Sequence, residues 1–337
     1  SSLGDVAHAA ALVPRLRALW PDCAIHWLCN SEYAPVPALA GVDRVWVFER
    51  QAWKHWHSMG RGIRNLLSLS TALRRERFDI VLDAQGLLRS AWFAWVTGAP
   101  RRIGFADAEV CARVFYSTRV RSAKDQVHAV DRCLALLAPL GDRATPARWA
   151  WPGLAADGAA VVARWNVEPG RYLLVVPGTR GLKKRWPARN FGLLAAHAWQ
   201  RWRMPILITG VAAEAPLAEL VRTTACANGC PPEAMRSAVG TCDLGQLACL
   251  LRHARAVIGG DTGPVHLADT LGATVIALMG PTTPARHGPY RQLHHVVSMA
   301  LECQPCQDVN GPCAQSTGCM AQLPVAMVMA KLADVLE

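Results

Sequence analysis

Apolar positions along the chain fall into short runs that alternate with longer segments of mixed polarity. Runs rich in Val, Ile and Leu predict strands, and apolar residues spaced three and four apart predict helices. In the first half, the pattern predicts strands at 24–29, 44–48 and 79–83 and helices near 6–19, 62–75, 88–97 and 127–139. In the second half, it predicts strands at 172–176, 206–210, 256–260 and 274–279 and helices near 190–202, 213–226, 244–253 and 264–271.

This alternation is typical of α/β proteins whose parallel sheets are covered by helices on both faces. The strands are apolar throughout, which agrees with burial on both sides. At 337 residues, the chain is too long for one ordinary core. We expect two doubly wound, Rossmann-like domains facing a central cleft that is lined by the carboxyl ends of their strands. The Gly-, Pro- and Ala-rich segment 141–158 is the candidate linker, which gives domains at 1–155 and 156–322 and a closing helix at 323–337.

The beginning of the chain affects the first domain. The opening SSLGDVAHAA lacks a starting Met and lacks the basic and then apolar pattern of a signal peptide. We expect the first strand of the N-terminal sheet to precede Ser1, and we expect Pro14 to interrupt the first helix. No run of about 18 uncharged apolar residues is present in the sequence, so no membrane-spanning helix is expected.

The net charge of the chain limits the classes of partner that it is expected to bind. A formal net charge of +11 and a pI near 9.3 indicate nucleic acid, anionic lipid or a phosphorylated substrate. A solvated, Arg-rich surface is the alternative interpretation. Because the arginines are scattered and no nucleic-acid-binding module is recognisable, the sequence disfavours nucleic acid.

Four of the twelve cysteines lie together in one polar segment. The segment CQPCQDVNGPCAQSTGC contains Cys303, Cys306, Cys313 and Cys319. A CxxC pair followed by two further cysteines suits a structural metal such as zinc. The spacing differs from the usual paired zinc knuckles, so disulfides and free thiols stay open. The other eight lie in or beside apolar segments, where free thiols behave as small buried hydrophobes.

The stretch GGDTGPVHLADTLG, residues 259–272, predicts a strand end, a turn and a helix. The mouth of this helix therefore lies at the carboxyl end of a strand. Its free N–H groups and the helix dipole favour a phosphate or pyrophosphate, and Gly263 allows close approach to the backbone. His266 on the first turn can donate to a phosphate oxygen. The alternative is that Asp261 or Thr262 simply caps the helix and that His266 is buried.

A second loop, VVPGTRGLKKRWP at 175–187, also follows a strand. It carries Thr179 and the cationic side chains of Arg180, Lys183, Lys184 and Arg185, and it enters a helix at Trp186-Pro187. A solvated basic loop is the alternative. Two anion-friendly loops at the same edge of one sheet favour a phosphate-bearing ligand. Neither loop is a P-loop and no GxGxxG follows a strand, which disfavours nucleoside triphosphates and nicotinamide cofactors.

Three further sets of polar residues follow strands or open helices. Glu214, four residues after Gly210, can accept hydrogen bonds from sugar hydroxyls, or it can act only on the helix dipole. Asp5 is an N-cap or, in a cleft facing a phosphate-rich site, a general base for a hydroxyl nucleophile. A strand-to-helix turn in LDAQGLLRSA offers side chains suited to polar acceptor groups, namely Asp83, Gln85 and Arg89.

Together these motifs resemble the ADP-heptose:lipopolysaccharide heptosyltransferases. The matching stretches are SSLGDV, DAQGLLRSA, RIGF followed by HAVDR, the PGT…KKRWP loop, and GGDTGPVHLADTLG with MGPTTP after it. They occur in the family's order over nearly the whole chain, and SSLGDV and DAQGL are closest to the heptosyltransferase I group. The resemblance implies a GT-B fold, an inverting and metal-independent transfer of heptose from ADP-L-glycero-D-manno-heptose to inner-core Kdo, and no cofactor.

The resemblance also implies roles for particular residues. Asp5 would be the base that deprotonates a Kdo hydroxyl. A carboxylate beside a diphosphate would be repelled, so we expect Asp261 to cap its turn and to bond heptose hydroxyls. The donor-binding set would be Thr179, Lys184, Gly210, Glu214, Asp261, Thr262, Gly263 and His266. The acceptor-binding set would be Asp83, Gln85, Arg89, Arg102 and His128.

The acceptor implied is Kdo-lipid A or a related phosphorylated glycolipid. We therefore expect a cytoplasmic protein that docks peripherally on the anionic inner membrane. Tryptophans suit interfacial contact or buried packing, and examples are Trp53, Trp56, Trp92 and Trp95.

Two alternatives remain open. The four-cysteine segment is unlike the heptosyltransferase I group and favours a heptosyltransferase II or III acting on an already heptosylated acceptor. A non-catalytic, zinc-stabilised anion-binding protein is the alternative from another class. An enzyme that epimerises nucleotide sugars is disfavoured, because the dinucleotide fingerprint is missing.

Overall fold

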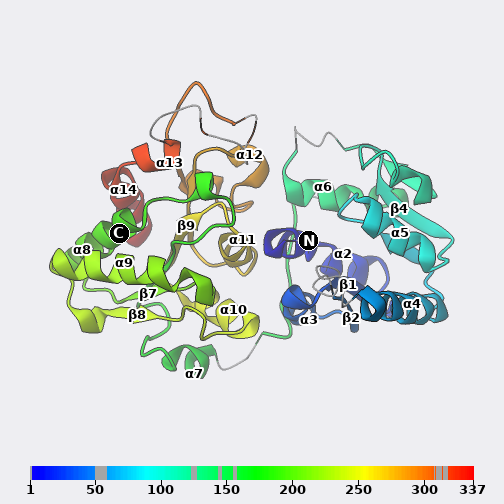
Figure 1. The fold of residues 1–337 in the computed structure, drawn as a ribbon, viewed down its shortest axis with the longest axis horizontal. Coiled ribbons are helices and arrows are strands. Elements are labelled where there is room, and N and C mark those ends of the chain that lie inside the picture. Colours follow the sequence, from blue (N-terminus) through cyan, green and yellow to red (C-terminus); the bar gives the residue numbers. More distant parts are fainter. Residues whose placement is uncertain are drawn as a thin grey trace. The chain divides into compact units, whose positions relative to one another are not determined.

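The computed structural model of the chain describes residues 2–49, 59–122, 127–142, 146–154, 158–306, 308, 313 and 318–337. Trp53 and Trp56 therefore lie outside the described residues. The chain forms two compact units, Ser1–Gly153 (unit 1) and Leu154–Glu337 (unit 2) (Figure 1). None of the described helices combines the length and the apolar character that crossing a membrane requires.

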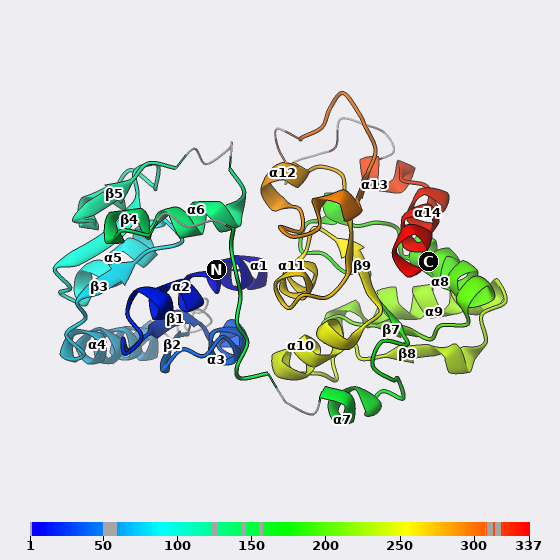
Figure 2. The same cartoon turned by 180° about the vertical axis from the view of Figure 1, so that it is seen from behind.

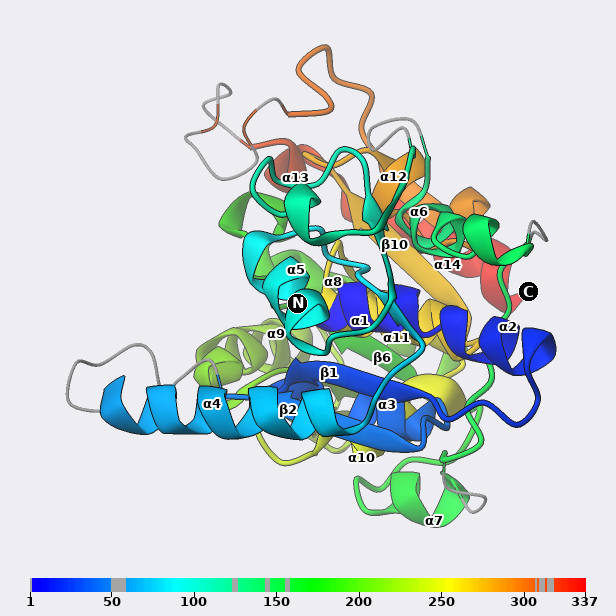
Figure 3. The ribbon, with the colours of Figure 1, turned by 90° about the vertical axis from the view of Figure 1, so that its right-hand side faces the viewer.

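Unit 1 contains two parallel sheets, one with the strand order β1-β2 and one with the order β3-β4-β5. The long helix α4 lies beside β1 and β2 (Figure 3), where its Leu73 packs with Trp46 of β2 and Phe93 of α5. The elements of unit 1 are α1 (Leu3–Ala9), α2 (Leu12–Leu19), β1 (His26–Asn30), η1 (Ser31–Tyr33), α3 (Pro35–Leu39), β2 (Arg44–Phe48), α4 (Met59–Arg75), β3 (Ile80–Leu82), α5 (Leu88–Val96), β4 (Arg101–Phe105), η4 (Arg113–Phe115), β5 (Thr118–Val120), α6 (Ala129–Ala135) and η5 (Ala138–Leu140).

The first helix begins with a capping box. Ser2 is the N-cap residue, and its hydroxyl accepts a hydrogen bond from the Asp5 N–H at 3.2 Å. The Asp5 carboxylate accepts the Ser2 N–H at 2.7 Å, so two N–H groups at the helix start are satisfied reciprocally. The expectation that Asp5 is itself an N-cap is therefore wrong. The predicted helix 6–19 forms two helices, and Pro14 lies in the first turn of α2, where an N–H is not needed for the helix.

Unit 2 contains one parallel sheet with the strand order β11-β10-β9-β6-β7-β8. Its elements are α7 (Gly158–Ala163), β6 (Leu173–Val176), η6 (Leu182–Lys184), α8 (Ala188–Trp202), β7 (Ile206–Ile208), η7 (Ala212–Glu214), α9 (Ala215–Ala227), η8 (Pro232–Ala234), β8 (Met235–Ser237), α10 (Leu244–His253), β9 (Ala256–Gly260), α11 (Gly263–Thr270), β10 (Val275–Met279), α12 (Pro284–His287), η9 (Leu293–His295), β11 (Val296–Ser298), α13 (Cys319–Gln322) and α14 (Val325–Leu336).

Helices cover both faces of this sheet. Leu173 and Val175 of β6 belong to the core cluster that includes residues of α8, α9 and α14. Because side chains alternate along a strand, Leu174 and Val176 point to the other face, where they are also buried. Figure 2 shows α8, α9 and α14 on one side of the strands and α10 and α11 on the other. The predicted α/β fold with parallel sheets buried on both faces is confirmed for unit 2.

The elements that the sequence pattern missed are short or polar. The strands β2 and β9 and the helix α10 have the bounds that the pattern predicts. The three-residue strands β5, β8 and β11 lie at sheet edges, and β4 begins with two arginines, so none presents a long apolar run. The helix expected at 127–139 ends at Ala135 and is followed by the separate turn η5.

Candidate active site

Side chains from three loops meet at one edge of the sheet in unit 2. The strands β10, β9 and β6 are neighbours and run parallel, so the loops that follow them leave the same edge. Lys184 follows β6, Asp261 follows β9, and Thr282 follows β10. The Asp261 carboxylate accepts hydrogen bonds from Lys184 Nζ at 2.7 Å and from Thr282 Oγ1 at 2.8 Å. One carboxylate therefore joins all three loops.

The same carboxylate contacts the first turn of α11. His266 Nε2 lies 2.9 Å from Asp261 Oδ1. The Asp261 side chain is only 7% exposed, and burial by itself would raise its pKa. The hydrogen bond and charge of His266, followed by those of Lys184, outweigh burial and hold the pKa of Asp261 well below its usual range. Asp261 is thus a buried carboxylate that stays ionised and fully partnered.

The mouth of α11 is left without a side-chain cap among the described residues. Thr262 is the N-cap residue, and neither its hydroxyl nor the Asp261 carboxylate accepts a capping bond from the helix. The expectation that Asp261 caps this turn is wrong, because its oxygens bind Lys184, Thr282 and His266 instead. Gly263 is the first residue of the helix, so no side chain covers the backbone at this position.

Two glycines allow the neighbouring loops to pass closely. A Cβ at Gly260 would lie 2.7 Å from the Lys184 carbonyl oxygen, so only glycine lets the β6 loop pass over the end of β9. A Cβ at Gly178 would overlap the Glu214 carboxylate. Glu214 Oε2 accepts the Val211 N–H at 3.0 Å and lies against Gly210. The carboxylate of Glu214 therefore bridges the ends of β6 and β7.

The basic loop after β6 is ordered by its own polar contacts and is not a simple solvated loop. Thr179 is buried, and its hydroxyl donates to the Gly181 carbonyl at 2.7 Å. Arg185 donates to the Thr179 carbonyl at 3.0 Å, and Lys183 Nζ donates to the Asp308 carbonyl at 2.6 Å. Of the two adjacent lysines, only Lys184 faces Asp261.

His287 is a neighbour of this site that the sequence did not indicate. It ends α12, and its pKa reflects the charges of Asp261, Lys184 and His266. Burial, partly opposed by Asp261, lowers the pKa of His287 to about 4. A single histidine in a four-residue helix carries no periodic or spacing signal, so only the fold places it here.

This low pKa predicts a pH-dependent stability. In the unfolded chain, histidine titrates near 6.5, so between pH 6.5 and about 4 the unfolded state binds the extra proton. The stability of the folded protein should therefore fall as the pH is lowered through this window. The His287→Gln variant should lose less stability over the same window. Thermal midpoints measured at pH 7, 6 and 5 test this, with exposed His197→Gln as the control. An identical pH profile in wild type and His287→Gln would contradict the prediction.

In unit 1, the candidate base Asp5 is exposed on the first turn of α1, which packs beside α6. His128 is the N-cap residue of α6, and its Nδ1 accepts the Val130 N–H at 3.1 Å. The His128 ring lies 5.7 Å from that of His8, measured between centroids. The sequence identified His128 but did not indicate its contact with α1.

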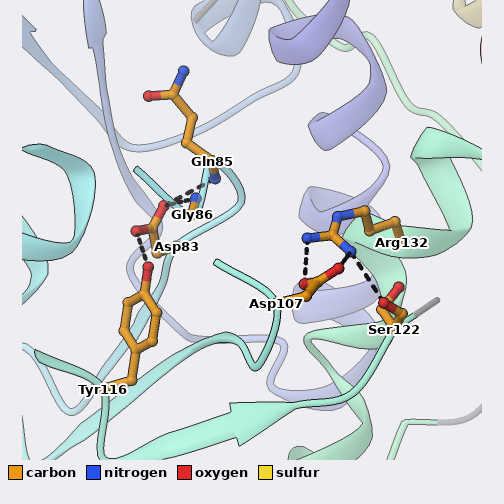
Figure 4. A network of polar contacts seen from close by, with 7 residues as sticks. All are labelled: Asp83, Gln85, Gly86, Asp107, Tyr116, Ser122 and Arg132. Carbon is orange, nitrogen blue, oxygen red and sulfur yellow. Dashed lines mark hydrogen bonds and ion pairs between the residues drawn. The ribbon is translucent and has the colours of Figure 1, made fainter. Parts of the chain in front are cut away.

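The DAQG turn is organised by a buried carboxylate. Asp83 accepts hydrogen bonds from the Tyr116 hydroxyl at 2.6 Å and from the backbone N–H groups of Gln85 at 2.9 Å and Gly86 at 3.2 Å (Figure 4). Burial and the Asp83 charge raise the pKa of Tyr116, which keeps the hydroxyl protonated as the donor. Asp83 therefore shapes the turn, whereas the Gln85 amide extends away from it (Figure 4).

Two of the candidate arginines have protein partners. Arg89 lies over the Phe48 ring, 5.5 Å from its centroid. Arg102 donates to the carbonyl groups of Phe115 at 2.8 Å and Ala99 at 2.5 Å, so it holds the loop after α5. A third arginine, which the sequence did not single out, is Arg132 of the HAVDR stretch. It forms a bidentate pair with Asp107 at 2.8 and 2.7 Å (Figure 4).

The four candidate metal ligands differ in their burial. Cys319 is buried and packs against Gly280, Cys303 and Cys306 are partly buried, and Cys313 is exposed. Within the described part of the chain, no group of three or more His, Cys, Asp or Glu side chains is arranged to hold a metal ion. A structural zinc at these four cysteines therefore stays a prediction.

The match to a family model identifies this chain of two α/β units as a glycosyltransferase. The chain belongs to glycosyltransferase family 9, the heptosyltransferase family, whose model matches residues 66–315. This confirms the resemblance found in the sequence.

Individual relatives support the same assignment. The chain is 31% identical over 314 residues to lipopolysaccharide heptosyltransferase 1 of Pseudomonas aeruginosa, covering 91% of this chain and 84% of that protein. It is 28% identical over 300 residues to lipopolysaccharide heptosyltransferase 1 of Escherichia coli K12, covering 86% of this chain and 88% of that protein. The solved structure of E. coli heptosyltransferase WaaC with ADP matches with a TM-score of 0.78 at 22% identity, over 99% of this chain and 97% of that one. The fold is therefore that of the heptosyltransferases, the predicted GT-B fold.

Proposed function

We propose that this protein transfers heptose from ADP-L-glycero-D-manno-heptose to the Kdo inner core of lipopolysaccharide, with inversion at the anomeric carbon. The observation that carries the proposal is the Lys184–Asp261 pair beside the uncapped mouth of α11. Family membership supports the reaction class. The two relatives named above are both called lipopolysaccharide heptosyltransferase 1, which supports the first heptose position.

In this proposal, unit 2 binds the donor. The pyrophosphate lies at the N-terminus of α11, against the N–H groups of Thr262 and Gly263, where the helix dipole favours negative charge. Lys184 supplies a full positive charge there. An ammonium group has three N–H donors, and Asp261 accepts one of them, so the carboxylate aims Lys184 and leaves donors for phosphate. Thr179 and Gly210 complete the loops around the donor.

Two further side chains act on the donor. Glu214 accepts hydrogen bonds from sugar hydroxyls, because its carboxylate is held by the Val211 N–H at the end of β7. His266 stays bonded to Asp261 and secures the first turn of α11. Asp261 itself is occupied by its three partners, so its part is to position Lys184 beside the departing phosphate.

The chemical step is a single displacement. Asp5 accepts the proton of a Kdo hydroxyl while that oxygen forms a bond to the heptose anomeric carbon. The bond from this carbon to the β-phosphate oxygen breaks, and its electron pair leaves with ADP. Lys184 and the α11 N–H groups stabilise the charge that develops on the leaving group, and the mechanism is metal-independent. Attack opposite to the leaving group inverts the anomeric centre.

Unit 1 binds the acceptor in this proposal. Gln85 and Arg89 contact its polar groups, and Asp83, Arg102 and His128 hold the loops that present them. The acceptor is a phosphorylated, membrane-anchored glycolipid, which agrees with the net charge of +11. We propose that the protein works in the cytoplasm, peripherally on the inner membrane.

Calorimetric titration tests the donor half of the proposal. ADP-heptose should bind more tightly than ADP-glucose, UDP-glucose or ADP, because only ADP-heptose supplies both the adenosine diphosphate and the heptose hydroxyls. Equal binding of UDP-glucose would contradict the assignment of the donor, and failure of a folded sample to bind any of them would remove the anion site.

The acceptor is tested separately, because the four-cysteine segment favours a heptosyltransferase II or III. With Kdo-lipid A and heptosylated Kdo-lipid A offered in parallel, transfer to Kdo-lipid A supports the first position. Transfer only to the heptosylated acceptor would favour the second or third position and leave the donor site standing. Elemental analysis of the same sample tests for a structural zinc at Cys303, Cys306, Cys313 and Cys319.

A further inference from the structure

An exposed apolar surface of unit 1 lies along α5, the turn η4 and the turn that precedes η4. Val110 is 73% exposed, Val114 71%, Trp95 52% and Leu88 45%. These four residues define the α5–η4 surface. Large apolar side chains that gather in one exposed patch are unusual on a soluble protein and indicate a binding surface.

Contacts between α5 and the segment 109–115 bring these residues close to one another. The Glu109 N–H donates to the Gly86 carbonyl at 3.0 Å, and the Glu109 carboxylate accepts the Leu88 N–H at 2.6 Å. Val110 therefore lies beside the beginning of α5. At the other end of the helix, the Trp95 ring lies 5.9 Å from that of Phe115, the residue after Val114. Leu88 and Trp95 are seven residues apart, about two turns, and so share one side of α5.

The surroundings of this surface are cationic. Residues 86–121 contain six arginines and only two acidic residues, Asp107 and Glu109. Asp107 is paired with Arg132, and Glu109 caps α5. Arg119 donates from Nε to the Arg113 carbonyl at 3.1 Å, which places its guanidinium beside η4. Arg113 of η4 and Arg119 therefore place two positive charges beside Val114.

We propose that the α5–η4 surface docks the protein onto a lipid bilayer that carries anionic headgroups. The apolar side chains enter the headgroup region, where an indole ring is favoured, and the arginines face lipid phosphates. A second copy of the chain fits less well, because a twofold interface through this surface would place the arginine-rich borders opposite each other. The proposal rests on the proposed function, since it brings unit 1 to a membrane-anchored acceptor.

Vesicle sedimentation with the full chain tests the proposal. Wild type should bind vesicles of phosphatidylethanolamine and phosphatidylglycerol, and it should bind phosphatidylcholine vesicles weakly. Val110→Glu/Val114→Glu should lower the partition coefficient at least about tenfold, because two carboxylates replace two apolar contacts at an anionic surface. Arg119→Gln should lower it about fivefold and should reduce its dependence on salt. Met327→Glu, which alters an exposed apolar residue of α14, is the matched control and should bind as wild type does.

Two outcomes would overturn the proposal. One is binding of the double variant that equals that of wild type. The other is a fall in molecular mass by light scattering in the double variant together with unaltered vesicle binding, which would identify a self-association surface. Trp95→Gln, a milder change at the same surface, should also lower vesicle binding. The test therefore does not depend on correct folding of the double variant.

Failure of the docking surface is distinguishable from failure of the proposed function. All of these variants should bind ADP-heptose by calorimetry and should act on a water-soluble Kdo acceptor as wild type does. Vesicle binding through this surface by a protein that does not bind ADP-heptose would reject the proposed donor but retain the surface. Heptose transfer by a protein whose vesicle binding is the same in the variants as in wild type would retain the proposed function and reject the docking surface.

Discussion

Replacing Asp5 with asparagine is expected to lower kcat by about 10²- to 10⁴-fold, the contribution typical of a general base. The Kd for ADP-heptose should stay unchanged, because the donor contacts proposed here come from unit 2. Asparagine keeps an oxygen that accepts the Ser2 N–H, so the capping box at the start of α1 survives. The variant therefore removes proton acceptance and little else. Steady-state kinetics with Kdo-lipid A, combined with calorimetry, measure both quantities.

Ser2→Ala is the matched control for this variant. It deletes the other half of the capping box and should cost about 1 kcal/mol of stability, while it leaves the Asp5 carboxylate in place. Turnover should stay close to that of wild type. A loss in Ser2→Ala as large as that in Asp5→Asn would show that the position of α1 matters and that proton acceptance does not. Full turnover by Asp5→Asn would end the assignment of Asp5 as the base.

Replacing Lys184 with alanine should weaken ADP-heptose binding and lower kcat by about 10²- to 10³-fold, the range for removing one group that stabilises developing negative charge. The loss has two sources. The leaving diphosphate loses a cation, and the buried Asp261 carboxylate loses the partner that offset its charge. Asp261 would then repel the diphosphate more strongly. Calorimetry and kcat measured at saturating donor separate the two effects.

The neighbouring lysine offers a closely matched control. Lys183 has the same charge and lies in the same turn, but its ammonium group bonds to the Asp308 carbonyl and not to Asp261. Lys183→Ala should therefore change donor affinity only slightly. Equal losses in the two variants would mean that the loop contributes general positive charge, and the specific role of Lys184 would be withdrawn. A Lys184→Ala protein that binds and turns over normally would remove this residue from the site.

The sequence predicted the two motifs of the proposed donor site because each is local. A strand that ends in Gly259-Gly260 and is followed by Asp-Thr-Gly and a helix can be recognised from adjacent residues. The partners of Asp261 could not be read in this way. Lys184 is 77 residues away and Thr282 is 21 residues away, and only the order of β6, β9 and β10 in the sheet joins them. Tertiary pairing also overturned the expectation that Asp261 would act as a cap.

Unit 1 was harder to predict for a related reason. Asp83 looked like a binding group because it follows a strand, yet its oxygens are occupied by Tyr116 and by its own turn. The hydroxyl of Tyr116 is 33 residues away, and no periodic pattern connects the two. Arg102 likewise belongs to a matching stretch, but it donates hydrogen bonds to backbone carbonyls. Polar residues in a motif thus divide into those that bind a substrate and those that fold the loop, and local sequence does not separate them.

If the donor binds at Lys184 as proposed, the junction at Asp261 links the affinity for the donor to the order of the three loops. The loops after β6, β9 and β10 share one carboxylate, so a ligand that engages Lys184 acts on the other two loops through the same atoms. The donor and any other factor that favours the joined loops are thermodynamically linked. Each increases the effect of the other by the same factor. Substitutions at Thr282 that never touch the nucleotide would therefore still appear in its dissociation constant, and a screen for thermal stabilisation of these loops would select tighter donor binding as well.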